Sequence, residues 1–250
     1  MNLRTTLPAL LIAVAAVAAC AAPETIKADP GDAVSLENFT AFRDPVGDWA
    51  LAGTVALNKD DPARLEWTEG TGAAVNGPKG KTAHLVTKAE FRDVELHIEF
   101  MMARGSNSGV YFQGRYEIQV FDSWGVEKPQ YGDCGGIYRR WHSEPGLDES
   151  QRGYEGTPPR VNAARRPGEW QSFDAVFRAP RFDAAGKKTA NARFVKVTHN
   201  GVVIHENVEV TGPTRAALFD DEKPLGPLML QGDHGPVAYR NLSVRPVELP

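Results

Sequence analysis

Three polar residues on one short segment are the first candidates for chemistry. Glu117, Gln119 and Asp122 belong to residues 115–122, where polar and apolar residues alternate. On a regular strand, alternate side chains point to the same face, so Glu117 and Gln119 share one surface. Asp122 joins that surface only if a β-bulge shifts it, and two carboxyl groups there would suit acid–base or nucleophilic chemistry on sugars. Without a bulge, the segment is a polar solvent face that ends in a turn aspartate.

The preceding segment adds residues suited to holding hydroxyl groups. Asn107, Tyr111 and Gln113 fall within residues 107–113, and Tyr111 and Gln113 share one face of the expected strand. Amides and phenols provide both hydrogen-bond donors and acceptors. This pattern points to a carbohydrate as the ligand.

A third polar group follows an apolar run near the C-terminus. Gln231, Asp233 and His234 come directly after residues 228–230, which are all apolar. A histidine at a strand end can act as a general base, as a metal ligand or as a structural hydrogen-bonding group. The sequence alone does not choose between these three roles.

Strands must position these residues. Runs with alternating or β-rich composition occur at residues 94–100, 108–113, 115–122, 172–177, 194–198, 227–231 and 238–246. Asn200-Gly201 lies between two β-rich runs and predicts a tight type I′ hairpin. With dispersed glycines and prolines and no long helical spacing, the chain predicts about twelve short strands. We therefore expect an all-β fold: a two-sheet antiparallel β-sandwich of the jelly-roll type in a single domain.

Residues 139–168 depart from the strand pattern. This segment is long, polar and rich in arginine, glycine and proline. Long irregular segments in compact domains are usually functional or disordered. We expect this one to cover a sheet face or the rim of a cleft.

The composition argues against nucleic acid as a partner. The 250 residues carry a formal net charge of −4 and contain no basic run. Affinity for nucleic acid comes mostly from Lys and Arg side chains that neutralise phosphates.

The N-terminus predicts export and lipidation. Arg4 precedes an apolar stretch at residues 7–17, which is too short to span a bilayer and is typical of a cleavable signal. The sequence Val-Ala-Ala-Cys that ends at Cys20 has the pattern of a lipobox; cleavage of a plain secretory signal near residues 16–18 is the alternative. We expect a signal peptide at 1–19, a lipidated cysteine and tether at 20–31, and the folded domain at 32–250. The lipid would hold the protein in the cell envelope, on the outer membrane facing the periplasm.

Cysteine usage agrees with this interpretation. The sequence contains two cysteines, Cys20 and Cys134. If Cys20 carries lipid, no intramolecular disulfide can form. Cys134 is expected to be a small buried residue, because a catalytic thiol needs a base and a positive environment.

Several blocks together resemble the DUF1080 family, the 3-keto-disaccharide hydrolase domain. The blocks follow the family order at residues 107–112, 114–122, 132–138, 161–163, 167–171, 177–183 and 237–246. The resemblance implies a concanavalin A-like jelly roll and cleavage of glycosides already oxidised at C3. The fold of that family is similar to retaining β-glucanases, whose catalytic strand reads Glu-x-Asp-x-x-Glu. Glu117, Gln119 and Asp122 keep that spacing but not its chemistry, which argues against direct double displacement.

A ketone at C3 changes the chemistry that the resemblance implies. The ketone acidifies the C2 proton; its removal gives an enolate that expels the C1 substituent, and added water makes the result a net hydrolysis. The expected roles are Glu117 or His234 as base, Asp122 as leaving-group acid, and Gln119 with Arg115 or Tyr138 around the enolate oxygen. A divalent metal ion would also stabilise an enolate, with Glu117, Asp122 and His234 as its candidate ligands.

The expected substrate-binding residues of this enzyme are Asn107, Tyr111, Gln113, Arg115, Gln119, Tyr138 and Gln231.

Two other functions are alternatives to the enzyme. A lectin-like lipoprotein that binds carbohydrate without cleaving it, or a structural surface lipoprotein, could use the same fold. An enzyme should gather Glu117, Asp122 and His234 in one pocket, whereas a lectin should show a shallow groove of exposed aromatics and amides. The sequence does not indicate the oligomeric state.

Overall fold

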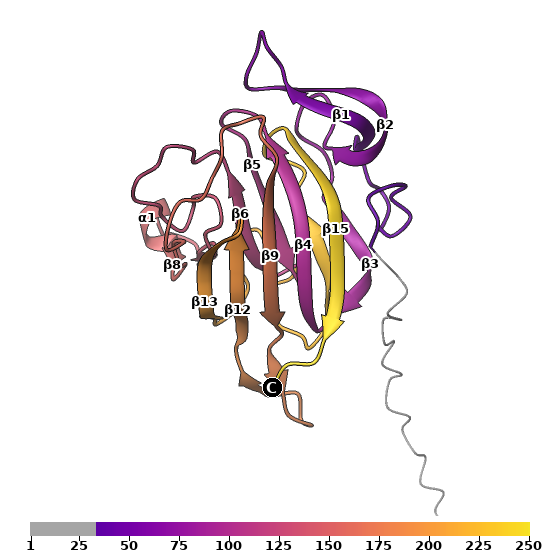
Figure 1. Cartoon of the computed structure of the whole chain (residues 1–250). Coiled ribbons are helices and arrows are strands. Elements are labelled where there is room, and N and C mark those ends of the chain that lie inside the picture. The colour runs from indigo at the N-terminus through magenta and orange to yellow at the C-terminus, as the bar shows by residue number, and fades with distance from the viewer. Residues whose placement is uncertain (1–33) are drawn as a thin grey trace, which may run out of the picture.

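Two antiparallel sheets packed face to face form the body of the protein (Figure 1). The computed structural model describes residues 34–250. The larger sheet has seven strands, in the order β1 (Ala50–Leu57), β2 (Leu65–Val75), β15 (Val237–Val247), β4 (Asp93–Met102), β9 (Gln171–Arg178), β12 (Ala192–His199) and β13 (Val202–Val210). The smaller sheet has four strands, in the order β3 (Leu85–Phe91), β14 (Gly226–Leu230), β5 (Asn107–Phe112) and β6 (Tyr116–Phe121). The expected all-β, two-sheet antiparallel jelly roll is confirmed.

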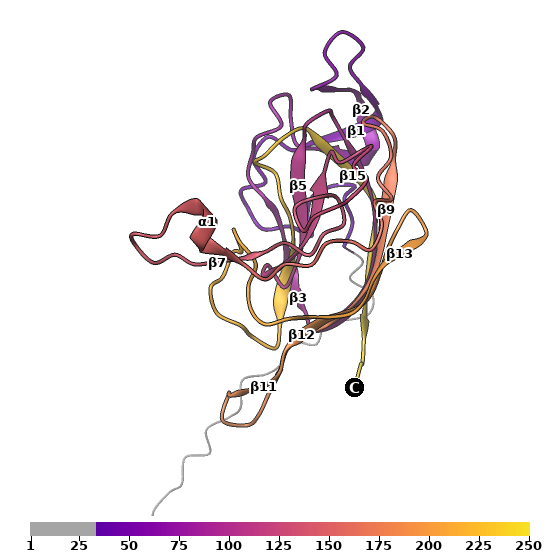
Figure 2. The same cartoon turned by 90° about the vertical axis from the view of Figure 1, so that its left-hand side faces the viewer.

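Short elements decorate this sandwich. They are β7 (Arg140–Trp141) paired with β8 (Gly153–Tyr154), β10 (Arg181–Phe182) paired with β11 (Lys188–Ala190), and the helix α1 (Glu149–Arg152). The first pair and α1 lie in the segment that lacked strand character in the sequence. Figure 2 shows this lobe projecting from the side of the four-stranded sheet, away from the seven-stranded sheet.

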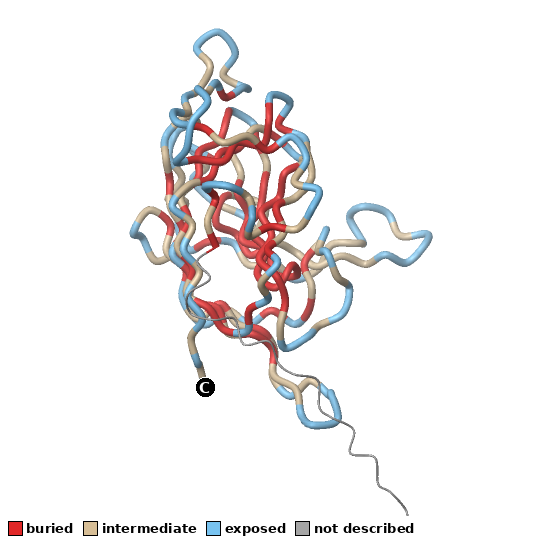
Figure 3. Tube along the Cα trace, turned by 90° about the vertical axis from the view of Figure 1, so that its right-hand side faces the viewer, coloured by how far each residue is buried: buried red, intermediate tan, exposed pale blue. Residues whose placement is uncertain are grey.

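Aromatic side chains from both sheets meet in the core. The Phe112 ring of β5 lies 5.0 Å from the Phe177 ring of β9 and 5.2 Å from the Phe194 ring of β12, centroid to centroid. Tyr116 of β6 adds a further contact with Phe177 at 5.4 Å. These side chains are essentially inaccessible to water, and Figure 3 shows the buried residues concentrated between the sheets. Burial of such large rings is the main favourable term for the fold.

The predicted turn at Asn200-Gly201 forms, and a second tight turn joins β5 to β6. Asn200 and Gly201 both have positive φ, 52° and 79°, as a type I′ turn between β12 and β13 requires. Gln113 and Gly114 do the same between β5 and β6, with φ of 54° and 63°. This three-residue connection fixes the pairing of β5 with β6, the strand that carries Glu117 and Gln119.

The N-terminal segment lies outside the described residues. The predicted signal peptide, the lipidated Cys20 and the tether at 20–31 therefore stay predictions. Among residues 34–250, no helix is long and apolar enough to cross a membrane. Cys134 is fully buried, as expected, and burial raises the pKa of its thiol to about 12.

The core packing leads to a stability prediction. Phe177→Ala should lower the free energy of unfolding by about 3–5 kcal/mol, because it leaves a cavity between three aromatic rings. Val176→Ala changes the adjacent residue on the outer face of the same strand and should cost at most about 1 kcal/mol. Urea unfolding of both variants measures the difference. Equal losses would contradict this assignment of the two faces of β9.

Candidate active site

A pocket of about 300 Å³ lies on the outer face of the four-stranded sheet. Its lining residues are Asn107, Tyr111, Glu117, Gln119, Tyr138, Arg215, Ala216, Gln231 and His234. The set combines a carboxyl group, an imidazole, a guanidinium, two phenols and three amides. Its volume is at the lower end of the range for small-molecule sites.

Strand pairing brings most of these residues together. Tyr111 of β5 is directly opposite Glu117 of β6, and Gly109 is opposite Gln119. The backbone N–H of Gln231, just after β14, donates to the Gly109 carbonyl. Gly109 is needed here because a Cβ would lie 2.2 Å from Glu117 Oε1. The missing side chain therefore makes the space that the Glu117 carboxyl group occupies.

Glu117 is the electrostatic centre of the pocket. Its side chain is buried, and within residues 34–250 no cation forms an ion pair with it. Burial raises the pKa of Glu117 to about 8; a side-chain hydrogen bond with Tyr111 lowers it, and the nearby Asp233 charge raises it. Glu117 is therefore mostly protonated near neutral pH and able to donate a proton. A carboxyl pKa shifted this far, in a pocket, is typical of functional sites.

Backbone hydrogen bonds from residues 135–138 also hold the edge of β6 that is not paired with β5. Gln119 exchanges backbone hydrogen bonds with Gly135 and Gly136, and the Tyr138 N–H donates to the Glu117 carbonyl at 3.2 Å. In the orientation that satisfies its partners, the Gln119 amide donates to Glu117 Oε1 at 3.0 Å and to the Ser108 carbonyl at 2.8 Å. These bonds hold the Gln119 amide against the Glu117 carboxyl group and keep the backbone of Tyr138 beside β6.

Asp233 orients His234, which lines the same pocket as Glu117. His234 Nδ1 is 2.5 Å from Asp233 Oδ1 and 3.4 Å from Gln231 Nε2. The shorter contact favours Nδ1–H as donor to Asp233, and in the neutral imidazole with this tautomer Nε2 carries the lone pair. His84 also faces Asp233, at 4.0 Å, and accepts a hydrogen bond from the Gly232 N–H. Burial lowers the pKa of His84, and Asp233 partly opposes this.

The structure does not bring Asp122 to this pocket. The pairing of β5 with β6 runs without a register shift, and β6 ends at Phe121. The Asp122 carboxylate instead accepts a hydrogen bond from the Gly105 N–H at 2.9 Å, in the turn before β5. The expected bulge, and with it the paired surface of Glu117 and Asp122, is wrong. The second carboxylate near Glu117 belongs to Asp233.

Two of the expected binding residues are structural. The Gln113 side chain donates to the Phe91 and Pro224 carbonyls below the β5–β6 turn. Arg115 is buried, with its guanidinium 2.8 Å from Asp221 Oδ1 and 4.5 Å from the centre of the Phe219 ring. Neither residue lines the pocket, so their expected contact with substrate is corrected. Their polar groups face inward because the turn positions them over the 219–224 loop.

The candidate metal ligands are not gathered either. Among residues 34–250, no group of three His, Cys, Asp or Glu side chains is arranged to hold a metal ion. Because Asp122 lies at the turn before β5, the set of Glu117, Asp122 and His234 does not fit a metal centre. We derive no catalytic step through a metal.

Sequence patterns missed Arg215 and His84 at this site and did not pair Asp233 with His234. Arg215 lies in a loop between β13 and β14, and His84 precedes β3. Neither is close in sequence to the strands that carry the pocket, so no local spacing links them to it. Asp233 stood beside His234 in the sequence and could have been assigned as its partner from that adjacency.

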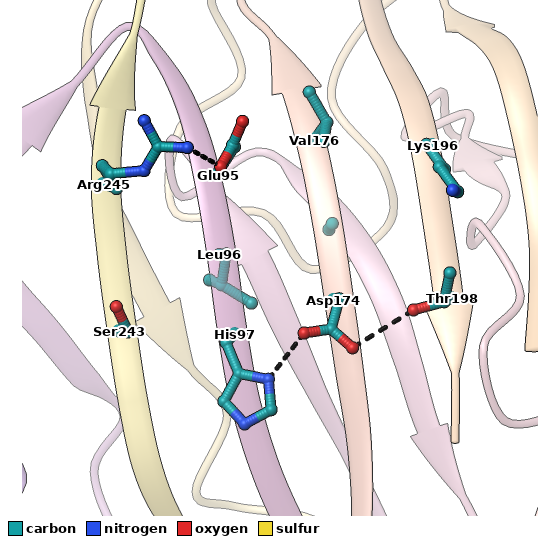
Figure 4. A pocket seen from close by; sticks show the side chains of 10 residues that line it. Glu95, Leu96, His97, Asp174, Val176, Lys196, Thr198, Ser243 and Arg245 are labelled. Carbon is teal, nitrogen blue, oxygen red and sulfur yellow. Dashed lines mark hydrogen bonds and ion pairs between the residues drawn. The ribbon is translucent and has the colours of Figure 1, made fainter. Parts of the chain in front are cut away.

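A second hollow, on the outer face of the seven-stranded sheet, carries ionisable groups that pair with one another (Figure 4). His97 Nδ1 is 2.6 Å from Asp174 Oδ1, whose other oxygen accepts a hydrogen bond from Thr198. Glu95 pairs with Arg245 beside them. Because these side chains are partly open to water and already satisfied, the hollow lacks the buried, unpaired carboxyl group of the first pocket.

Comparison with solved structures agrees with this fold. A "putative glycosyl hydrolase" from Parabacteroides distasonis is 26% identical, with a TM-score of 0.58, and the match covers 87% of this chain and 84% of that one. Another from the same organism is 21% identical, with a TM-score of 0.46, covering 80% and 99%. An endo-β-1,4-glucuronan lyase from Trichoderma reesei shows 12% identity and a TM-score of 0.39, covering 85% and 93%. The curated proteins contain no match.

A family model assigns the chain directly. The 3-keto-alpha-glucoside-1,2-lyase-like domain matches residues 38–245, which include every pocket residue described above. Together with the 26%-identical putative glycosyl hydrolase, this match supports carbohydrate processing as the general role. The chain belongs to the 3-keto-alpha-glucoside-1,2-lyase-like family of domains.

Proposed function

We propose that the protein cleaves 3-keto-glycosides by elimination at C1–C2, followed by addition of water. The observation that carries this proposal is the buried Glu117 carboxyl group, protonated near neutral pH, in one pocket with the Asp233–His234 pair. Elimination next to a ketone needs a base for the C2 proton and an acid for the departing oxygen. The pocket offers one group for each task.

His234 is the proposed base. Its Nδ1–H is held by Asp233, so Nε2 can accept the C2 proton of a sugar bound in the pocket. The electrons of the C2–H bond then move toward the C3 ketone, which becomes an enolate. Asp233 stabilises the imidazolium that forms, as a carboxylate does when it orients a catalytic histidine.

Glu117 is the proposed acid. When the enolate collapses, a C1–C2 double bond forms and the C1–O bond breaks, and Glu117 gives its proton to the leaving oxygen. The proton taken up by His234 returns to Glu117 through water, which restores the site. Water added across the new double bond converts the product to the free 3-keto sugar. A pKa near the working pH is what efficient proton transfer requires.

The remaining polar groups bind and stabilise. The Tyr138 phenol lines the pocket and can donate a hydrogen bond to an oxygen that gains charge. The Gln119 amide has both N–H groups engaged, with Glu117 and the Ser108 carbonyl, and positions the Glu117 carboxyl group. The buried Gln231 Oε1 has no partner within the described residues, so it is free to accept from a sugar hydroxyl. Asn107 adds an amide at the pocket wall. Together they suit a ligand rich in hydroxyl groups.

Two substitutions test the assignment of the acid. Glu117→Gln should lower kcat for aglycone release from 3-keto-trehalose by about 100-fold or more, since it removes the proton donor with little change in shape. Asp122→Asn should leave kcat within a few-fold of wild type. Parallel assays with a chelator determine whether a divalent metal takes part. Wild-type protein that binds the substrate without releasing the aglycone would support the lectin-like alternative instead.

The pKa of Glu117 predicts two pH effects. As an acid, Glu117 must be protonated, so kcat should fall as the pH rises through about 8; a rise through the same range would make Glu117 the base.

The same pKa predicts how stability depends on pH. Between pH 4.5, the ordinary pKa of Glu in the unfolded chain, and about pH 8, Glu117 is protonated in the folded state but ionised in the unfolded state. The free energy of unfolding should therefore decrease as the pH rises across this range. Urea unfolding at pH 5.5 and 8.5 should show a smaller decrease for Glu117→Gln than for wild type.

We also propose that the chain is exported and lipid-anchored. The support is the signal-like N-terminus and the small residues before Cys20. In a bacterial host, wild-type protein should incorporate labelled palmitate and fractionate with membranes, whereas Cys20→Ser should lose the label. Label retained by the Cys20→Ser variant would contradict this proposal.

A further inference from the structure

Arg215 enters the pocket from a stack of alternating arginine and aromatic side chains. We call Tyr131, Arg139, Trp141 and Arg215 the arginine–aromatic stack. The Arg139 guanidinium lies 5.4 Å from the centre of the Tyr131 ring and 5.0 Å from that of Trp141. The Arg215 guanidinium lies 3.7 Å from the Trp141 ring. Stacking on a ring face leaves the N–H groups at the edge of a guanidinium free to bind anions.

The backbone around Arg215 is fixed on three sides. The Arg215 N–H donates to the Arg139 carbonyl at 2.9 Å, and the Arg215 carbonyl accepts from the Tyr111 hydroxyl at 3.2 Å. The Thr214 hydroxyl donates to the Arg115 carbonyl, just before β6. Ala216, which also lines the pocket, has φ of 62°, a conformation that costs a non-glycine residue energy and is concentrated at functional sites. The position of Arg215 is thus set before any ligand arrives.

The Arg215 guanidinium has donors to spare. Within the described residues its one ion-pair partner is Glu149 of α1, at 3.2 Å, and Glu149 is 72% exposed. A guanidinium has five N–H donors, and an exposed ion pair contributes little. Glu149 is also the nearest carboxylate to Arg139, at 3.9 Å. Two arginines therefore share one solvated carboxylate beside the pocket.

The opposing charges in the pocket do not cancel Arg215. Burial keeps Glu117 protonated near neutral pH, and Asp233 is bonded to His234. The wall formed by Arg215 is consequently the cationic side of the cavity. A planar, preorganised guanidinium at this wall matches the geometry of a carboxylate, which it can bind through two parallel hydrogen bonds.

We propose that Arg215 selects substrates that carry a carboxylate, either on the sugar cleaved or on its aglycone. This inference rests on the proposed function of the same pocket and adds the substrate class. The lobe of residues 139–154 then has a defined role, because its Arg139 and Trp141 hold Arg215 in place. In this assignment Arg215 is a binding residue and takes no part in proton transfer.

Calorimetric binding of unoxidised glycosides tests the proposal. One arm compares methyl α-D-glucuronide with methyl α-D-glucoside, and the other compares 4-carboxyphenyl α-D-glucoside with phenyl α-D-glucoside. In at least one arm, wild-type protein should bind the carboxylate ligand about tenfold more tightly than its neutral counterpart, with a preference that weakens as salt rises. The arm that shows the preference identifies where the carboxylate lies.

Variants separate Arg215 from general charge. Arg215→Gln should abolish the preference, and Arg215→Lys should restore part of it, because lysine keeps the charge without the fork. Arg193→Gln removes an arginine of the exposed Arg193–Glu209 pair on β12 and should keep the preference. No preference in either arm, or a preference that survives in Arg215→Gln, would overturn the proposal. Because these ligands lack the ketone, this result is independent of the turnover test on neutral 3-keto-glycosides.

Discussion

The burial of one carboxyl group without a cation is the constraint on which the site depends. Taking an ionised carboxylate out of water costs so much that the group keeps its proton instead. Glu117 meets this condition: its neighbours are phenols, an amide and Asp233, and within residues 34–250 no arginine forms an ion pair with it; Arg115, two residues before it, pairs with Asp221. An arginine turned toward Glu117 would hold the carboxylate ionised and remove its ability to donate. The structural pairing of Arg115 with a distant loop is therefore as important to the chemistry as the pocket residues.

The sheet supports this arrangement through its backbone. β6 is paired with β5 on one side and with residues 135–138 on the other, so Glu117 cannot move outward without breaking hydrogen bonds on both sides. The aromatic core lies directly beneath, since Tyr116 and Ile118 point to the opposite face of the same strand. Core packing thus determines how rigidly the acid is held, and rigidity of this kind is what a site needs to keep its groups in reacting geometry.

Periodicity in the sequence predicted the strands well and the site only partly. The alternation around Glu117 and Gln119 predicted their shared face. Successive side chains of a strand point to opposite faces, so once the apolar residues face the core, the polar residues between them face outward. The side-chain direction of Asp122 depended on whether the strand continued past Phe121. The strand ends there, so the backbone of the following turn, and not the strand alternation, determines where Asp122 points. Arg215 reaches the pocket, and His84 reaches Asp233 beside it, through long-range packing that leaves no local pattern. Gln113 and Arg115 are residue types that are common in binding sites, but the turn between β5 and β6 directs their side chains into the protein and away from the pocket.

The acid near Glu117 is Asp233 and not the expected Asp122, and this difference changes what the pair of carboxyl groups can do. Two acids on one strand would stand at a fixed separation on a shared surface, the arrangement used for displacement at a sugar carbon. Here one acid is a buried proton donor on a strand, and the other lies in a loop, bonded to a histidine. Such a pair divides acid and base between two walls of a cavity. This division suits removal of a proton from one carbon and protonation of the oxygen on the next, which is elimination rather than displacement.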